Sequence, residues 1–180
     1  MNKTILLPGV YQYEFPKDLS KKIVKKISKI KNDRWTHAGV GVGEIKHHIR
    51  STLNIDLFQN VPELAEETKK YMVQCVKDYC KEFDIKVSGN EGLNLLRYET
   101  NDKYEFHVDD GPGLERKVSC LIYLNPGEYQ GGGTTFKHFN YTISPSEPAL
   151  VLFPSNYPYL HAADPIISGT KYIVVTWISE

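Results

Sequence analysis

Short apolar segments lie close together in the second half of the chain, and their spacing restricts the fold more than any other feature. From Leu93 onward, runs rich in β-branched and aromatic residues alternate with turn-forming Gly, Pro and Asn. The runs cover residues 93–98, 104–109, 117–124, 134–143, 149–153 and 171–178. Because no helical pattern separates them, we predict antiparallel pairing in a sandwich or jelly roll.

The last of these runs, residues 171–178, is apolar on both faces. Val174 and Ile178 lie on one side of the predicted strand, whereas Ile173 and Trp177 lie on the other. A strand with two apolar faces is buried from both sides. We therefore predict that this strand lies in the centre of a sheet.

The first half of the chain shows helical periodicity. After Pro16, apolar side chains recur at helical spacing, at Leu19, Ile23, Ile27 and Ile30. Pro62 is typical of a first helical turn, and a second apolar stripe follows it at Leu64, Tyr71, Cys75, Tyr79 and Phe83. We predict a mainly β chain with N-terminal helices, an α+β fold in a single domain spanning residues 1–180. Residues 1–90 would form a mainly helical support region, and residues 91–180 a double-stranded β-helix (jelly-roll) core packed against the helices.

The charge balance and the cysteines restrict the binding partners of the protein and the cell compartment in which we expect it. The 22 Lys and Arg residues cancel the 22 Asp and Glu residues, so no net field attracts a polyanion. Nucleic acid is therefore not the expected partner, although a local basic patch from Lys21 to Lys31 leaves it open. The three cysteines form no C-x-x-C pair, no apolar signal segment opens the chain, and no run reaches the roughly 18 to 20 apolar residues of a membrane span. We expect a cytoplasmic protein without a membrane partner.

Two histidines and one carboxylate are candidates for a metal site. His107 and Asp109 lie two residues apart on a predicted strand, so their side chains point to one face, roughly 6 to 7 Å apart along it. An H-x-D pair alone is more often a surface pair than a metal site. His161 follows the run 149–153 and a loop, and a neighbouring strand could carry it to the same cavity. Two His and one carboxylate occupy one face of an octahedral ion and leave positions open, as in non-heme Fe(II) oxygenases.

Lys171 lies ten residues after His161, at the start of the apolar final run. A charge among apolar neighbours is costly unless it meets an anion. Because Lys171 shares one strand face with Val175 and Trp177, its ammonium should point into the same interior as the indole. The alternative is an edge lysine whose ammonium reaches water.

Several short motifs follow one another in the second half of the chain. They are Arg97-Tyr98, then N-D-K-Y-E-F-H-V-D at 101–109, I-Y-L-N at 122–125, G-G-G-T-T-F at 131–136, L-H-A-A-D-P at 160–165, G-T-K at 169–171 and W-I at 177–178. Their order and gaps resemble the prolyl 4-hydroxylase-like branch of the Fe(II)/2-oxoglutarate-dependent dioxygenase superfamily. The resemblance covers about residues 91–180 and, more loosely, the helical first half.

The resemblance implies a role for each matching residue. The implied catalytic iron ligands are His107, Asp109 and His161. The implied contacts with 2-oxoglutarate are Lys171, which would pair with the distal carboxylate, and Tyr98, Tyr123, Thr134 and Trp177. On the substrate side, Arg116 matches an arginine near the entrance in relatives, and Tyr104 is available for an aromatic groove. Residues 91–180 would then be the catalytic core.

The implied reaction hydroxylates an unactivated C–H bond, consumes O2 and 2-oxoglutarate, and releases succinate and CO2, with Fe(II) as cofactor and ascorbate as the expected reductant. The resemblance implies a prolyl residue of a peptide or protein as the substrate, and a proline-rich chain with a pre-set conformation would suit an aromatic groove. The same iron site would also suit another protein side chain, a free amino acid or a nucleobase. A non-catalytic, cupin-like jelly-roll binding module is the alternative from a different class.

Overall fold

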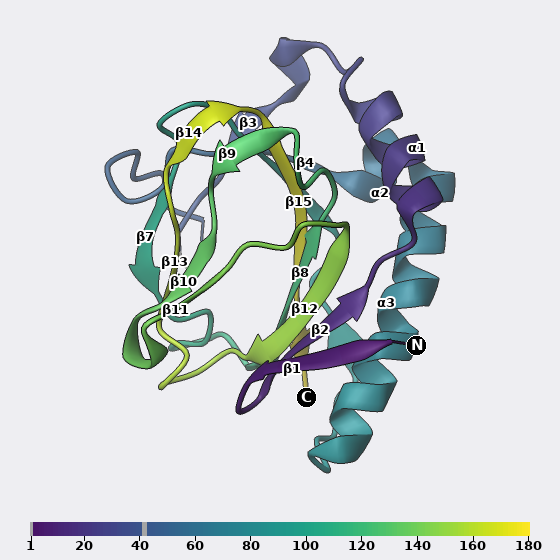
Figure 1. The fold of residues 1–180 in the computed structure, drawn as a ribbon, viewed down its shortest axis with the longest axis vertical. Coiled ribbons are helices and arrows are strands. Elements are labelled where there is room, and N and C mark those ends of the chain that lie inside the picture. The colour runs from purple at the N-terminus through teal and green to yellow at the C-terminus, as the bar shows by residue number, and fades with distance from the viewer. Residues whose placement is uncertain (1, 41–42) are drawn as a thin grey trace.

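The structure, a computed structural model, describes residues 2–40 and 43–180, and most of its strands form two antiparallel sheets that face each other (Figure 1). The larger sheet has its longest strands in the middle. In order across the sheet, its strands are β1 (Lys3–Leu7), β2 (Val10–Glu14), β12 (Ala149–Pro154), β8 (Arg116–Tyr123), β15 (Lys171–Ser179), β6 (Asn94–Tyr98), β4 (Leu53–Asp56) and β3 (Thr36–His37). The short strand β5 (Gly89–Asn90) pairs with the end of β15.

The smaller sheet lies opposite β8 and β15 (Figure 1). Its strands, in order, are β11 (Tyr141–Ile143), β10 (Thr134–Phe136), β13 (His161–Ala163) and β7 (Tyr104–His107). A separate pair is formed by β9 (Tyr129–Gly131) and β14 (Ile166–Gly169). This pair carries the chain from the smaller sheet back to β15, since β14 ends two residues before β15 begins.

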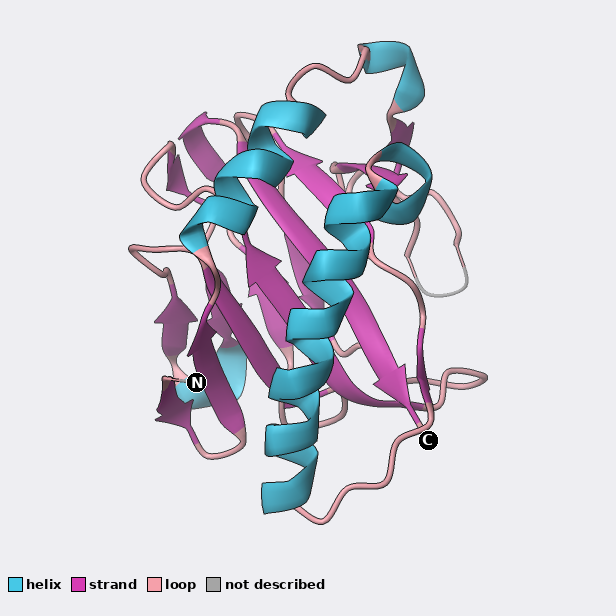
Figure 2. Ribbon diagram, turned by 90° about the vertical axis from the view of Figure 1, so that its right-hand side faces the viewer, coloured by secondary structure: helices cyan, strands magenta, loops and turns pink. Residues whose placement is uncertain are grey.

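The two longer helices, α1 (Lys17–Ile27) and α3 (Pro62–Glu82), cover the outer face of the larger sheet (Figure 2). The chain also forms a short helix, α2 (Leu57–Asn60), and the 3-10 turns η1 (Asn32–Arg34) and η2 (Lys137–Phe139). α1 begins directly after Pro16, with Asp18 in its first turn and Lys26 in its last, as the helix dipole favours. None of the helices in the described ranges is long and apolar enough to cross a membrane.

β15 separates two apolar cores. Val174 on one face belongs to the same buried cluster as Ile23 of α1 and Cys75 of α3. Ile173 on the other face belongs to a second cluster, which lies between the sheets and includes Phe136 of β10. The strand is thus buried from both sides, which confirms its predicted central position.

The fold confirms the predicted jelly-roll core with N-terminal helices, although several boundaries differ. Residues 134–143 form a hairpin of β10 and β11 instead of one strand, because η2 and Asn140, with a left-handed φ of 47°, reverse the chain. β7 ends at His107, so Asp109 lies in the following loop and not on a strand. The first half also adds β1, β2 and β4 to the larger sheet, which its helical periodicity did not indicate.

Candidate active site

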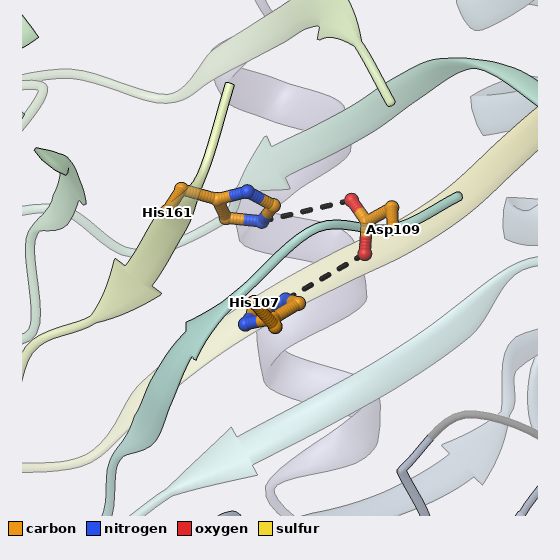
Figure 3. Close-up of side chains that lie close together, drawn as sticks. All are labelled: His107, Asp109 and His161. Atoms are coloured by element: carbon orange, nitrogen blue, oxygen red, sulfur yellow. Dashed lines mark ion pairs between the residues drawn. The ribbon is translucent and has the colours of Figure 1, made fainter. Parts of the chain in front are cut away.

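Three potential metal ligands converge beside β7 and β13 (Figure 3). The two strands pair antiparallel, and His161 is the register partner of His107. Asp109 follows in the loop after β7 and turns its carboxylate back toward both imidazoles. The ligand atoms of the three side chains all lie within 4.8 Å of one another, so one ion can contact them all.

Backbone carbonyl groups determine which ring nitrogen of each imidazole carries the proton. Nδ1 of His107 lies 2.8 Å from the carbonyl oxygen of Glu105, and Nδ1 of His161 lies 3.0 Å from that of Tyr159. A carbonyl only accepts, so Nδ1 carries the hydrogen and Nε2 keeps its lone pair. Both Nε2 atoms lie 3.6 Å from a carboxylate oxygen of Asp109. Each histidine therefore presents the nitrogen that can bind a metal.

Burial determines the charge state of the cluster. It lowers the pKa of His161 to about 4, and the neighbouring His107 acts in the same direction. Burial by itself would raise the pKa of the Asp109 carboxyl, but the adjacent His161 and His107 hold that pKa well below its usual range. At neutral pH, His161 is neutral and Asp109 is ionised. These are the protonation states in which both side chains bind metals.

Lys171 lies at the start of β15 with only 1% of its surface exposed. Its Nζ donates to the carbonyl oxygen of Gly132 at 2.6 Å. The ammonium also lies 5.2 Å from the ring centre of Tyr98 and 5.0 Å from that of Tyr123. Burial lowers the pKa of Lys171 to about 7, although the charge of Asp164 opposes this shift. A carboxylate ligand would supply the strong counter-charge that these neutral groups do not provide.

Gly132 makes room for this lysine. The residue has a left-handed φ of 64°, and a Cβ atom added there would lie 2.3 Å from Cδ1 of Ile166 and 3.3 Å from Cδ of Lys171. A larger residue would therefore displace β14 or the stem of Lys171. The second glycine of the G-G-G-T-T-F motif thus shapes the pocket through its size and its carbonyl oxygen.

One pocket joins the metal ligands to Lys171. Its lining residues are Arg50, Leu96, Tyr98, Tyr104, His107, Asp109, Leu121, Thr134, His161, Ala163, Lys171, Ile173, Val175 and Trp177. The two-His, one-carboxylate donor set fits a non-heme iron and leaves coordination positions open. The ammonium in the same pocket fits the distal carboxylate of 2-oxoglutarate.

The other residues predicted to contact the cosubstrate lie around this pocket. Tyr98, Thr134 and Trp177 line it directly. Tyr123 lies behind Thr134, and the two hydroxyl groups are 2.6 Å apart. Both side chains are buried, and the bond between their hydroxyl groups holds them against each other. Their roles toward 2-oxoglutarate stay predictions.

Arg116 lies at the mouth of the pocket, where two neighbours and the backbone fix its position. Its guanidinium stacks on the ring of Trp177 at 3.7 Å and makes two bonds of 2.6 and 2.5 Å to the Glu91 carboxylate. Nη1 also donates to the backbone carbonyl of Asp109 at 3.0 Å. Arg116 therefore holds the loop that carries Asp109, and it also lines the entrance of the pocket. The sequence alone did not indicate Glu91 as its partner.

Arg50 is a third cation at the site, and unlike Lys171 and Arg116 it was not indicated by the sequence. Its guanidinium lies 4.6 Å from the ring centre of Tyr104, and Tyr104 in turn stacks on His107 with ring centres 3.6 Å apart. Nη1 donates to the Gly39 carbonyl at 2.7 Å, whereas the buried Nε atom has no partner in the described chain. Arg50 lies far from the motifs in the sequence, before the short strand β4, so no spacing pattern indicated it.

An outer groove of about 320 Å³ continues from the pocket to the surface. It shares Arg50, Leu96, Tyr104, Asp109, Val175 and Trp177 with the inner pocket. Arg116 and Glu91 also line it. The structure thus brings together the predicted metal ligands, Lys171, Trp177 and both predicted substrate contacts, Arg116 and Tyr104, along one continuous cavity.

Comparison with known proteins agrees with this geometry. Residues 93–179 match the family model described as the 2OG-Fe(II) oxygenase superfamily. All three potential ligands lie within that segment. The segment that carries the candidate ligands is thus similar to the 2OG-Fe(II) oxygenase superfamily. This match confirms the family predicted from the motifs.

A protein of Acanthamoeba polyphaga mimivirus, provisionally named a prolyl 4-hydroxylase, is 33% identical over 124 residues. The alignment covers 58% of this chain and 51% of the viral protein, so the chain spans about half the length of this relative. This relative supports a prolyl 4-hydroxylase-like branch of the superfamily.

Solved structures confirm the fold. A Pseudomonas putida prolyl-4-hydroxylase matches with a TM-score of 0.78 and 20% identity, over 96% of this chain and 92% of the other. A Trichoplax adhaerens prolyl hydroxylase, solved with a peptide fragment of a hypoxia inducible factor, matches with a TM-score of 0.77 and 17% identity, over 95% and 83%. At these identities the likeness concerns the fold.

Proposed function

We propose that the protein is an Fe(II)- and 2-oxoglutarate-dependent dioxygenase that hydroxylates a prolyl residue in a peptide or protein. The observation that carries this proposal is the single pocket that joins the His107, Asp109 and His161 cluster to the buried Lys171. A metal-binding module without catalysis has no need for a buried ammonium beside its ligands. The superfamily match supports the oxygenase class, and the prolyl substrate rests on more distant relatives.

Each side chain of the pocket has a physical task in this proposal. When bound, iron and 2-oxoglutarate would activate O2, the oxidant that hydroxylates the C–H bond, while 2-oxoglutarate is oxidised to succinate and CO2. His107, Asp109 and His161 would hold the metal on one face, and Lys171 would orient the cosubstrate by pairing with its far carboxylate. The apolar lining, including Leu121 and Ile173, would exclude water from the reacting atoms.

The outer groove fits an extended peptide. Tyr104 and Trp177 present aromatic surface close to the metal ligands, as a prolyl ring would require. Arg50 offers a buried Nε donor that has no partner in the described residues, and a peptide carbonyl could accept from it. A proline-rich segment loses little conformational entropy when it binds such a groove. The peptide found in the Trichoplax relative occupies a protein of the same fold.

The direct test is oxidation of a peptide library that includes proline-rich and proline-free sequences. Purified protein is incubated with Fe(II), 2-oxoglutarate, O2 and ascorbate, which we propose as the reductant. The expected result is a mass gain of about 16 on proline-containing peptides, with one succinate per hydroxylation. The same gain on a free amino acid, another side chain or a nucleobase would replace the prolyl assignment and keep the oxygenase. Absence of succinate under all conditions would favour the non-catalytic binding module.

A further inference from the structure

Two buried serines form a chain of hydrogen bonds that ends on the metal-binding carboxylate. Oγ of Ser119 lies 2.6 Å from Oδ2 of Asp109, and Oγ of Ser155 lies 2.9 Å from Oγ of Ser119. The serines have 0% and 1% of their surface exposed. Ser119 lies on β8, and Ser155 directly follows β12, the strand that pairs with β8. Neither residue belongs to the motifs recognised in the sequence.

The charge of Asp109 determines which group donates in each of these hydrogen bonds. An ionised carboxylate only accepts hydrogen bonds, so the Ser119 hydroxyl must donate to Oδ2. Ser119 then has no second hydrogen, and the bond between the serines must be donated by Ser155. Each hydroxyl thus has one defined orientation. Such a buried, fully satisfied network holds its members rigidly.

The same serine also fixes the backbone of the ligand loop. The Ser155 carbonyl accepts from the amide groups of both Asp109 and Asp110, each at 3.0 Å. The Ser155 amide donates in turn to the Lys117 carbonyl at 3.1 Å, on β8. Both the main chain and the side chain of Asp109 are therefore attached to β8 and to the end of β12.

Asp109 needs this support because it lies beyond the end of β7. His107 and His161 are held by strand pairing and by Nδ1 bonds to carbonyls, whereas a carboxylate in a loop can turn about two torsions. While Ser119 holds Oδ2, the carboxylate lies between the two imidazoles, with Oδ1 3.6 Å from Nε2 of His107 and Oδ2 3.6 Å from Nε2 of His161. Partners of this kind raise metal affinity by orienting the ligand.

We propose that Ser119 and Ser155 are positioning residues that orient the Asp109 carboxylate for metal binding. The proposal rests on the metal site of the proposed function. It predicts that loss of the Ser119 hydroxyl weakens metal binding without removing any ligand. Loss of the Ser155 hydroxyl acts through Ser119, so its effect has the same direction and is smaller.

The test measures the dissociation constant of Mn(II), a stand-in for Fe(II) that is stable in air, by calorimetry on the full chain. Ser119→Ala is expected to bind Mn(II) roughly 10 to 100-fold more weakly than the unaltered protein. Ser119→Thr keeps the hydroxyl and should restore most of the affinity. Thr176→Val is the matched control, because Thr176 is buried on the adjacent β15 and its hydroxyl has no partner in the described residues. Its affinity should stay within threefold of the original.

The possible results distinguish failure of the proposed function from failure of the positioning role alone. If the unaltered protein binds no Mn(II), the proposed function fails. If the unaltered protein binds Mn(II) and Ser119→Ala binds it equally well, the positioning role is wrong and the metal site stands. Circular dichroism checks that each variant folds, and Ser155→Ala carries the test if Ser119→Ala does not fold. An equal loss of affinity in Thr176→Val would also overturn the proposal, because the effect would then be a general one of the sheet.

Discussion

His161 lies directly opposite His107 in the antiparallel ladder of β7 and β13. Side chains at opposite positions share one face of a sheet, with their Cβ atoms about 4.5 to 5.5 Å apart. Two candidate ligands far apart in the sequence are thereby brought together by strand register alone. A slip of one residue would turn one imidazole to the other face of the sheet. The third candidate ligand, Asp109, is held by the loop contacts that Ser155 and Arg116 provide.

Removal of the carboxylate should abolish metal binding and turnover. Asp109→Ala leaves two imidazoles without the charged ligand, so we expect Mn(II) affinity to fall at least 100-fold and succinate formation to reach background. The measurement is calorimetry combined with a succinate assay. Asp110→Ala is the control, since the Asp110 side chain is outside the cluster. Full activity of Asp109→Ala would contradict the ligand assignment.

Replacement of the buried ammonium should affect 2-oxoglutarate far more than metal. In Lys171→Met, the cosubstrate carboxylate would be buried without a counter-charge, which costs about 3 kcal/mol or more. We expect the KM for 2-oxoglutarate to rise at least 100-fold, with Mn(II) affinity changed less than threefold. Lys86→Met removes an exposed lysine and should leave both values unaltered. An unchanged KM in Lys171→Met would show that the cosubstrate binds elsewhere.

The lowered pKa of Lys171 predicts proton uptake on cosubstrate binding. Without a carboxylate partner its pKa is about 7, because burial disfavours the ammonium. An ion pair with 2-oxoglutarate raises this pKa, so at pH 8 to 9 binding should take up close to one proton and weaken as the pH rises. Calorimetry in buffers of different ionisation enthalpy measures this uptake. Binding without proton exchange at pH 8.5 would contradict the pairing.

The same shift has a consequence for stability in the absence of 2-oxoglutarate. The ordinary pKa of a lysine is 10.5, whereas that of folded Lys171 is about 7. Between these values the unfolded chain holds a proton that the folded protein has lost. The Lys171 contribution to the free energy of unfolding should therefore increase as the pH rises through this window. Urea unfolding at pH 7 and pH 9 should show this increase, and Lys171→Met should reduce it.

Loss of the Glu91 charge should weaken binding in the outer groove. Glu91→Gln removes the charge-assisted pair that holds Arg116 against Trp177. We expect the KM for a peptide substrate to rise about 5 to 20-fold, equivalent to about 1 to 2 kcal/mol, while the KM for 2-oxoglutarate stays constant. Glu99→Gln alters a more exposed pair with Arg97 and serves as the control. An equal rise of the peptide KM in both variants would show that the Glu91–Arg116 pair has no specific role in peptide binding.

Sequence reasoning identified those parts of the site that have short, regular spacings. The two-residue step between His107 and Asp109, and the position of Lys171 in an apolar strand, are local patterns with a direct physical meaning. The structure brings these residues together with His161, although it places Asp109 in a loop, where the alternation rule does not apply. The carboxylate still meets the imidazoles because the chain bends back toward them (Figure 3).

The supporting residues carry no such local pattern. Arg50, Ser119 and Ser155 are common residue types in ordinary surroundings, and only the tertiary fold brings them to the metal ligands. Strands β1 and β2 were missed for a related reason. Both are short. β1 pairs with β2, and β2 pairs with β12, a strand more than a hundred residues later in the chain.

The central claim is that one cavity holds both iron and 2-oxoglutarate, and an anaerobic absorption titration tests it most directly. 2-Oxoglutarate is added to the Fe(II)-loaded protein while the visible spectrum is recorded. We expect a weak visible charge-transfer band that saturates at one equivalent per chain, is lost in Asp109→Ala, and needs far more 2-oxoglutarate in Lys171→Met. A protein that binds Fe(II) and 2-oxoglutarate independently, without this band, would contradict the central claim.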